Sequence, residues 1–369
     1  MSDGTKIEWA ANADGSPGAT WNPIRARRRS DGKLGWFCIH ASEGCRLCYA
    51  ERWNEGRFGN GLSYKKQNEA EVEIFLDEKT LLQPLRWKKP RTIFVCSMSD
   101  LFGEFVPDAF IDRVLTVAAC APQHTFIVLT KRDKRMRAYF EALFGSQVAP
   151  RGVRCPAWPA LLNRVERVWL EERGRDAYLA DVRPLLERGL RTLPPGPLPN
   201  VWLGVSIEDR ENGAGRGPNL AMTPAAARLW SVEPLLSDLG DMTRLGLFDT
   251  LDGARKAVDW VIVGGESGPG ARPMHPDWVR SIRDQCAAAG VAFFFKQWGA
   301  HAPVTIPKTD WRGETPVAWP LGRLGAHPWP DHDDTMVVLT RVGKRAAGRV
   351  LDGRTHDERP PLAHQRVAA

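Results

Sequence analysis

The chain has 369 residues, of which 43% are hydrophobic and 26% are charged, the proportions of an ordinary soluble protein. No apolar run approaches the length of a membrane span, and the first residues carry no signal-peptide pattern. We therefore predict a cytoplasmic protein without a membrane segment, in which thiols stay reduced. The net charge of +7 permits a polyanionic partner without requiring one.

The first expected elements are short. Lys6–Trp9 alternates as a strand, and Ala19–Pro23 is a second extended piece that ends in a turn. A polar, basic loop is expected over Arg25–Gly35. Trp36–Ile39 is then a short apolar strand that enters a cysteine-rich loop, and Tyr49–Trp53 begins a helix.

The cysteine-rich loop holds three of the seven cysteines, Cys38, Cys45 and Cys48, in the pattern C-x6-C-x2-C. A two-residue turn lets the thiols of a C-x2-C pair converge on one metal or cluster, and the third thiol arrives from the longer part of the loop. Three thiolates leave one coordination position open. At an iron–sulfur cluster that position could bind a small molecule, and at zinc it would hold a catalytic water.

Other interpretations of the cysteines stay open. Small buried cysteines are often inert. His40 lies between the cysteines and could complete a structural Cys3His zinc site. A disulfide is not expected, because the total is odd and the remaining cysteines are scattered singly: Cys96, Cys120, Cys155 and Cys286.

Further along, apolar strands alternate with helices, which predicts a parallel sheet covered on both faces. The expected strands are Arg91–Cys96, Thr125–Thr130, Asn200–Val205, Arg228–Val232, Val258–Val263 and Val291–Phe295. The expected helices are Asp108–Cys120, one that ends near Tyr139, one that holds Ala221–Ala227, and His275–Ala289.

A polar residue follows each of these six strands: Asp100, Lys131, Glu208, Glu233, Glu266 and Lys296. In a β/α barrel the carboxyl ends of the strands form the active-site face. In a doubly wound sheet they would line a crevice. Together with the strand that feeds the cysteine loop, the pattern predicts an α/β fold, a partial (β/α)6-type TIM-like barrel with a helical insertion.

The domain boundaries follow from this pattern. Residues 1–145 would form the first half of the barrel, 146–199 a helical insertion and linker, 200–300 the second half, and 301–369 a C-terminal extension. Within the extension, Thr335–Arg341 is an expected strand and Gly343–Arg354 a hairpin or turn. Disorder is expected from Pro360 onward.

The glycine-rich stretch Gly264–Gly270 follows an apolar strand but lacks the ending of a phosphate-binding loop. One interpretation is that its glycines let the backbone approach a ligand while Glu266 points into the site. The other is a simple turn in which Glu266 pairs with Arg272 or Lys296.

Several motifs resemble the phage Gp37/Gp68 family. They are Thr20–Pro23, Gly44–Glu51, Pro84–Pro90, Ser97–Phe102, Leu129–Arg132, Asn200–Ser206, Glu233–Leu236, Val263–Met274 and Phe294–Gly299. The resemblance runs over nearly the whole chain. That family is similar to radical S-adenosylmethionine proteins and, more distantly, to the spore photoproduct lyase group.

The resemblance implies a partial β/α barrel, a [4Fe–4S] cluster on Cys38, Cys45 and Cys48, S-adenosylmethionine on the fourth iron, and an external electron donor. The chain departs from the usual motif, since its first cysteine gap is six residues instead of three, and no Gly-Gly-Glu follows the second barrel strand. The methionine amine would instead be held by Ser97, Ser99 or Asp100. Candidates for ribose, adenine or substrate contacts are Ser206, Glu208, Glu233 and Glu266, and Lys131 and Lys296 could meet a carboxylate or phosphate.

Three functions are compatible with these residues. The first is a radical S-adenosylmethionine enzyme; the basic balance and the fifteen tryptophans favour a nucleic acid or nucleotide substrate. The second is a zinc-stabilised nucleic-acid-binding protein without enzymatic activity. The third is a zinc hydrolase with Glu266 or Asp100 as general base.

Overall fold

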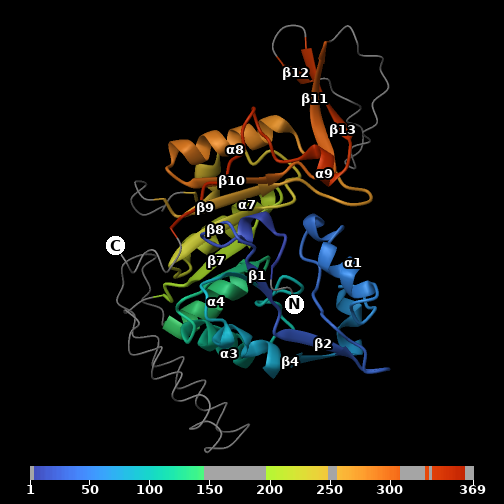
Figure 1. Cartoon of the computed structure of the whole chain (residues 1–369), viewed down its shortest axis with the longest axis vertical. Coiled ribbons are helices and arrows are strands. Elements are labelled where there is room, and N and C mark those ends of the chain that lie inside the picture. The colour runs from blue at the N-terminus through green and yellow to red at the C-terminus, as the bar shows by residue number, and fades with distance from the viewer. Residues whose placement is uncertain (1–3, 145–196, 248–255, 308–328, 332–334, 362–369) are drawn as a thin grey trace, which may run out of the picture. The chain divides into compact units, whose positions relative to one another are not determined.

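The computed structural model describes residues 4–144, 197–247, 256–307, 329–331 and 335–361 (Figure 1). The chain forms two compact units. Unit 1 contains residues 1–206, 216–229 and 360–369, and unit 2 contains residues 207–215 and 230–359. All but the last three residues of the predicted helical insertion, 146–199, lie outside the described residues, as does most of the tail from Pro360.

Seven strands form the main sheet, in the order β1-β5-β6-β7-β8-β9-β10. Their bounds are Ala19–Trp21, Thr92–Val95, Thr125–Thr130, Val201–Ser206, Ala227–Val232, Trp260–Gly264 and Ala292–Gln297. The pairs β1–β5, β5–β6, β6–β7 and β9–β10 are parallel. The strands succeed one another in chain order, whereas a doubly wound sheet reverses its order at a switch point. The α/β prediction is confirmed, and the order is that of a singly wound sheet.

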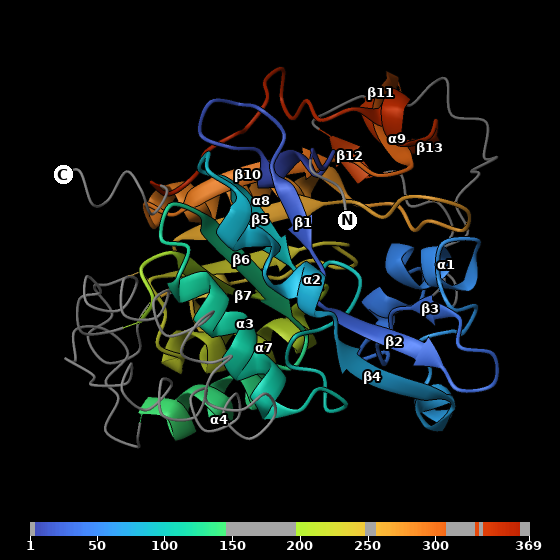
Figure 2. The same cartoon turned by 60° about the horizontal axis from the view of Figure 1, so that its bottom comes forward.

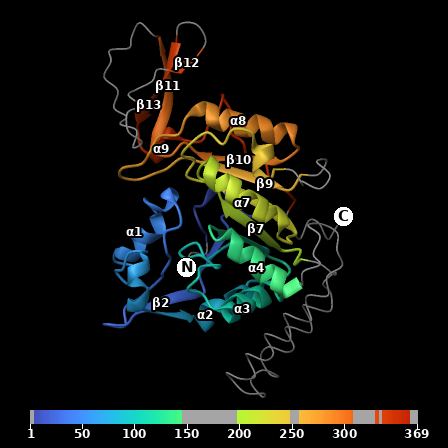
Figure 3. The same ribbon diagram turned by 180° about the vertical axis from the view of Figure 1, so that it is seen from behind.

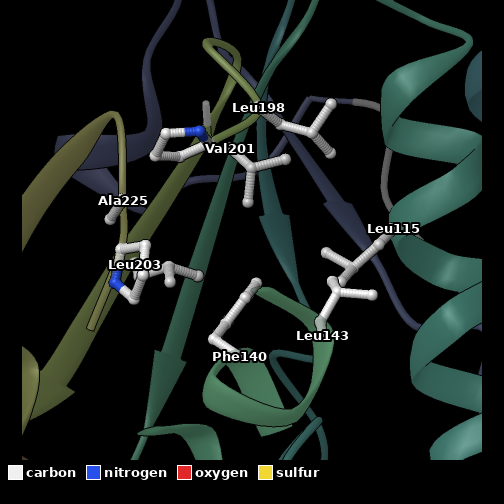
Figure 4. A pocket seen from close by; sticks show the side chains of 9 residues that line it. Leu115, Phe140, Leu143, Leu198, Val201, Leu203 and Ala225 are labelled. Carbon is white, nitrogen blue, oxygen red and sulfur yellow. The ribbon is translucent and has the colours of Figure 1, made fainter. Parts of the chain in front are cut away.

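Helices α3 (Asp108–Ala119) and α4 (Asp133–Phe144) lie on one face of β5, β6 and β7 in unit 1 (Figure 2). Leu115 of α3 and Phe140 of α4 face Leu203 of β7 across a small apolar hollow (Figure 4). The hollow measures about 10 Å³, which is hardly space for one water molecule. It is a packing contact and not a ligand site.

The predicted basic loop is instead part of a second, antiparallel sheet with the order β3-β2-β4. Ile24 and Ala26 of β2 are buried, and Arg25 and Arg27, which alternate with them, pack on aromatic rings. The guanidinium of Arg25 lies 4.6 Å from the Trp36 ring centroid, and that of Arg27 lies 4.8 Å from Phe75. The three strands are β2 (Ile24–Arg28), β3 (Leu34–Gly35) and β4 (Val72–Leu76).

Two other N-terminal predictions are wrong. Residues Glu8–Ala10 form a 3-10 helix, η1, where the predicted strand would end, and Trp9 is buried edge-to-face against Phe94 at 4.9 Å. Trp36–Ile39 forms no strand, so the seventh strand of the main sheet is β1. The other short helices of this region are η2 (Glu43–Cys45), α1 (Tyr49–Glu55), η3 (Lys66–Glu71), α2 (Glu78–Leu81) and η4 (Gln83–Arg86).

Helix α7 ends earlier than predicted. It runs over Arg210–Met222, while Ala227, which was expected in the helix, belongs to β8. The buried Arg228 of β8 donates hydrogen bonds to the carbonyls of Leu220 and Thr223 at the end of α7. These bonds supply additional donors to carbonyls at the C-terminal end of the helix, where intrahelical donors run out.

In unit 2, α8 (Pro276–Ala288) lies along β10 (Figure 3). An antiparallel sheet with the order β11-β13-β12 follows, and its central strand confirms the strand predicted at Thr335–Arg341. The region expected as a hairpin holds the short helix α9 and one isolated bridge between Leu351 and Arg354. The remaining bounds are η6 (Met242–Leu245), β11 (His301–Pro307), β12 (Trp329–Asp331) and α9 (Lys344–Ala347). No described helix is both long and apolar enough to span a bilayer.

Residues 348–358, which we call the C-terminal strap, cover the outer side of β10. The amide of Phe295 donates to the carbonyl of His356 at 2.9 Å, and Phe294 and Asp357 form an antiparallel bridge. The indole of Trp260 donates to the Glu358 carbonyl at 2.8 Å, and that of Trp298 donates to the Val350 carbonyl at 2.9 Å. β10 is the last strand of the sheet, so the strap occupies an edge that would otherwise be open to pairing with other chains.

Candidate functional site

The cysteine loop of unit 1, residues 36–48, connects β3 to α1. Cys38, Cys45 and Cys48 are half-buried and form no disulfide. The Cys48 amide donates to the Cys45 carbonyl at 3.1 Å, which closes the turn of the C-x2-C pair. Cys48 is the residue immediately before the first turn of α1.

Two hydrogen bonds hold the backbone on both sides of Cys38. The Ser99 hydroxyl donates to the Phe37 carbonyl at 2.7 Å, and the Arg132 guanidinium donates to the Ile39 carbonyl at 2.7 Å. Ser99 lies just after β5 and Arg132 just after β6. Cys38 is therefore held at the carboxyl ends of two neighbouring parallel strands.

The segment around Cys48 is anchored to the same place. The hydroxyls of Tyr49 and Tyr64 donate to the carbonyls of Ser97 and Met98 at 2.6 and 2.7 Å. Tyr64 and Met98 also belong to a buried apolar cluster against which the side chains of Cys38 and Cys48 pack. The cysteine loop thus rests on residues 97–99 through both polar and apolar contacts.

Asp100 joins the ends of β5 and β6. Its buried carboxylate accepts hydrogen bonds from the Thr130 hydroxyl at 2.7 Å and from the amides of Lys131 and Phe102, both at 3.0 Å. Ser97 and Ser99, which with Asp100 were predicted to hold a ligand amine, are likewise engaged. In this structure the three residues support the loop and the strand ends, and an incoming amine would have to share or replace those bonds.

The thiols of the loop influence one another. Burial raises the pKa of Cys38 well above its ordinary value, and negative charge on Asp100 and Cys48 raises it further, whereas Arg132 lowers it. Burial also raises the pKa of Cys48, against which backbone amides at the start of α1 and the charge of Lys131 act. Without metal these two thiols are protonated at neutral pH, and a metal ion would have to displace their protons.

His40 lies on the same loop but has its own partner. Its Nε2 is 2.8 Å from a carboxylate oxygen of Glu51, and the other oxygen of Glu51 accepts from the Tyr64 amide at 2.8 Å. The ring is thereby connected to α1. Histidines that bind metals commonly make such a carboxylate contact through the nitrogen that does not bind the metal.

The donor set fits a metal in number and chemistry. Three half-buried thiols on one loop, with the cations Lys131 and Arg132 near them, are suited to iron–sulfur clusters or zinc. Within the described residues, however, no three His, Cys, Asp or Glu side chains lie at the spacing of a finished ligand set. Binding would therefore require the thiols to turn toward a common centre.

The predicted residues of unit 2 are engaged with one another. Lys296 donates to Glu233, and Arg272 donates to both oxygens of Glu266, at 2.8 Å from Nε and 2.6 Å from the terminal nitrogen. The side chains of Arg272 and Glu266 are only 8% and 6% exposed, so this is a buried ion pair. Of the two interpretations of Glu266, the structure has the one in which it pairs with Arg272.

Two further predicted residues are held through their backbone carbonyls. Glu208 is fully buried, and its carbonyl accepts from the Leu236 amide at 2.7 Å. Ser206, which belongs to unit 1, is tied down through its carbonyl, to which Arg216 donates at 2.6 Å. Neither residue joins the contacts that anchor the cysteine loop.

The glycines before Glu266 are required by the protein's own backbone. A side chain at Gly265 would stand 2.0 Å from the Trp298 carbonyl, and one at Gly264 would stand 3.2 Å from the carboxylate of Glu233. The glycines therefore let the backbone approach Trp298, just after β10, and the side chain of Glu233. The interpretation in which they let the backbone approach a ligand is not needed to explain them.

Sequence reasoning missed three residues that position the cysteine loop: Asn22, Tyr64 and Arg132. The Asn22 amide donates to the Ser97 hydroxyl at 3.1 Å and accepts from the Met98 amide at 2.9 Å. Asn22 and Arg132 both belong to motifs that carried the family resemblance, and this signal could have pointed to them. Nothing in the pattern around Tyr64 distinguished it.

A family model matches residues 4–360, nearly the whole chain, and its description is "Protein of unknown function (DUF5131)". The chain belongs to this family. No curated protein and no solved structure matches the chain. The anchoring of the cysteine loop therefore carries the functional argument for this DUF5131 member.

Proposed function

We propose that this protein is a radical S-adenosylmethionine enzyme in which Cys38, Cys45 and Cys48 hold a [4Fe–4S] cluster at the carboxyl rim of a partial (β/α)6-type barrel. One observation carries the proposal. The loop with three thiols is anchored on both sides of Cys38 to the ends of β5 and β6. Such strand ends are where barrel enzymes place their reacting groups. The resemblance to the phage Gp37/Gp68 family and to radical S-adenosylmethionine proteins supports the same assignment.

The residues around the loop suit this role. Lys131 and Arg132 would offset the negative charge of thiolates and sulfide, and the apolar side chains of Tyr64 and Met98 would keep water from one side of the loop. Ser99 and Arg132 would fix the backbone of Cys38. When bound, the cluster and S-adenosylmethionine would supply reductive cleavage of the sulfonium and radical chemistry on a substrate.

Metal analysis tests the proposal. After anaerobic reconstitution with iron and sulfide, we expect about four irons and four sulfides per chain, with the visible absorbance of a thiolate-bound cluster. Cys45→Ala should lose that absorbance, whereas Cys120→Ala should keep it, because the Cys120 thiol lies at the end of α3, outside the loop.

A second measurement separates an enzyme from a cluster protein. The reduced, reconstituted protein should convert S-adenosylmethionine to methionine and 5′-deoxyadenosine. A protein that loads the cluster but releases neither product is not a radical S-adenosylmethionine enzyme, and one zinc without sulfide would overturn the cluster itself.

The contact between His40 and Glu51 favours a second candidate, the zinc-stabilised nucleic-acid-binding protein. In that case His40 would join the three cysteines through its other ring nitrogen, and Glu51 would orient the ring. His40→Ala should then lose bound zinc along with Cys45→Ala. Under the first proposal, His40→Ala should keep the cluster.

A further inference from the structure

Beside the cysteine loop, unit 1 exposes two stacked aromatic side chains. Trp53 of α1 is 56% exposed and Phe58 is 65% exposed. Their ring centroids are 5.4 Å apart, and their planes differ by 29°. We call them the aromatic pair. Large rings contribute most to stability when buried, so a stacked pair left in solvent marks a contact surface.

The aromatic pair sits on a rigid support. Two fully buried asparagines, Asn54 and Asn60, fold the turn that carries Phe58 back onto α1. The Asn54 side chain donates to the Asn60 side chain at 2.7 Å and to the Leu62 carbonyl at 2.8 Å, while it accepts from the Trp36 amide at 2.8 Å. The aromatic pair is thus presented in a fixed orientation before any partner arrives, which lowers the entropic cost of binding.

The segment around the aromatic pair accounts for most of the net positive charge of the protein. Residues 24–66 contain ten Lys or Arg and four Asp or Glu, a net charge of +6 out of +7 for the whole chain. Five of these cations make ion pairs. Arg28 pairs with Asp31 and Arg46 with Glu43 inside the segment, and three pair with acids just beyond it: Arg25 with Asp77, Arg27 with Glu73 and Lys66 with Glu69. The other five cations of the segment make no ion pair with any residue that the structure describes.

The cations nearest the aromatic pair in sequence are exposed. Arg52 and Arg57 precede Trp53 and Phe58 directly, and neither makes an ion pair with any residue that the structure describes. The exposed Arg29, Lys33 and Lys65 likewise make no ion pair with the residues that the structure describes. Exposed rings with flanking unpaired cations combine the two features that bind bases and phosphates.

We propose that the aromatic pair is a base-stacking platform for single-stranded nucleic acid, with Arg52 and Arg57 as phosphate contacts. The faces of bases are accessible in a single strand but are covered in a duplex, so stacking selects the single strand. A protein partner would gain less from the local excess of positive charge. This binding does not require a metal cluster, so it stands apart from the catalytic proposal.

The test is binding of a fluorescein-labelled, mixed-sequence single-stranded DNA to the full chain, followed by fluorescence anisotropy. Trp53→Ala should weaken binding by about 5- to 150-fold, the range of one lost base stack, whereas Trp53→Phe should keep most of the affinity. Replacing both Arg52 and Arg57 by Gln should reduce the slope of log K against log salt by about 1.4, at about 0.7 per phosphate contact on single strands.

Matched controls come from unit 2. Val350→Ala removes an apolar side chain that is 53% exposed, and Arg244→Gln removes a cation whose side chain is 76% exposed. Both should leave binding unchanged. The proposal is overturned if Trp53→Ala binds the DNA as tightly as the parent does, or if the parent binds duplex and single strand equally. It is also overturned if the parent does not bind DNA and instead self-associates in a way that Trp53→Ala abolishes.

The iron and sulfide content of the same variants separates this inference from the catalytic one. Trp53→Ala should load iron and sulfide as the parent does. If the parent binds single-stranded DNA through Trp53 but takes up no cluster, the catalytic proposal fails and the platform stands.

Discussion

Polar residues follow the strands of the main sheet in both units, but their partners differ. In unit 2 the charged side chains at or just after the ends of β8, β9 and β10 neutralise one another, as Lys296 does with Glu233 and Arg272 with Glu266. In unit 1 the residues after β5 and β6 hold a loop whose thiols form no disulfide. A polar residue at a strand end is therefore a weak sign of function by itself. A stronger sign is a reactive group, such as a thiol, whose backbone other residues hold in place while the group itself takes part in no ion pair or disulfide.

The largest expected effect tests whether the unit 2 ion pair is structural. Arg272→Ala would leave the Glu266 carboxylate buried without its charge partner, and we expect the free energy of unfolding to fall by about 3–5 kcal/mol. Urea unfolding measures it. Arg244→Ala, which alters an exposed ion pair, should change stability by less than about 0.5 kcal/mol. If the two variants lose the same amount, Glu266 is not held by Arg272 and is available to a ligand.

The second prediction concerns the pH dependence of the thiols in metal-free protein. Because the pKa of Cys38 and of Cys48 is raised, their thiolate fractions should still be climbing at pH 9. Alkylation by iodoacetamide should then rise more steeply from pH 7 to pH 9 than it does at an ordinary thiol, most of all at Cys38. An unfolded peptide with the ordinary thiol pKa near 8.5 should gain only about 25-fold, because its ionisation nears completion.

Peptide mapping by mass spectrometry gives the rates at each cysteine, and a plateau below pH 9 at Cys38 would contradict the prediction. The same shift has a consequence for stability. The unfolded chain ionises these thiols at lower pH than the folded chain does. The metal-free protein should therefore lose stability as the pH rises above the unfolded thiol pKa.

The smallest expected effect tests the anchor beside Cys38. Ser99→Ala removes the hydrogen bond to the Phe37 carbonyl and should cost about 0.5–1.5 kcal/mol. Hydrogen exchange should quicken in peptides that cover residues 36–48 and stay unchanged in those that cover β6. Ser237→Ala in unit 2, which removes an exposed hydrogen bond to the Asp238 carbonyl, serves as the control. Uniform acceleration across unit 1 would mean that Ser99 supports the whole unit and not the loop.

The sheet was predictable because its strands are continuous apolar runs with polar ends. Thr125–Thr130 is predicted with its observed bounds, and so is Thr335–Arg341 in the last sheet. The β2 strand was missed because Arg25 and Arg27 alternate with the small Ala26, which gives a basic pattern. The rings on which these arginines pack, Trp36 and Phe75, lie elsewhere in the sequence, so the local pattern does not reveal the strand. Helix α7 was misplaced because three glycines and Pro218 lie within it.

The candidate site was predictable only in part. The spacing of the cysteines identified the loop and its place near strand ends. The contacts that hold it come from residues distant in the chain, such as Asn22 with Ser97 and Arg132 with Ile39, and no local pattern encodes such pairs. The pairing of Glu266 with Arg272 remained one of two interpretations, because a carboxylate after a glycine turn is equally suited to a ligand.

The C-terminal strap affects how the chain is made. About fifty residues separate the end of β10 from the start of the strap at Gly348, so a ribosome working at about 5–20 residues per second needs roughly 3–10 s to supply it. During that interval the amide of Phe295 has no His356 carbonyl to donate to, and the nascent sheet ends in an unpaired strand that can bind other chains. Slower translation of this stretch should favour aggregation, and a chaperone that binds extended apolar segments would find its target at residues 292–297.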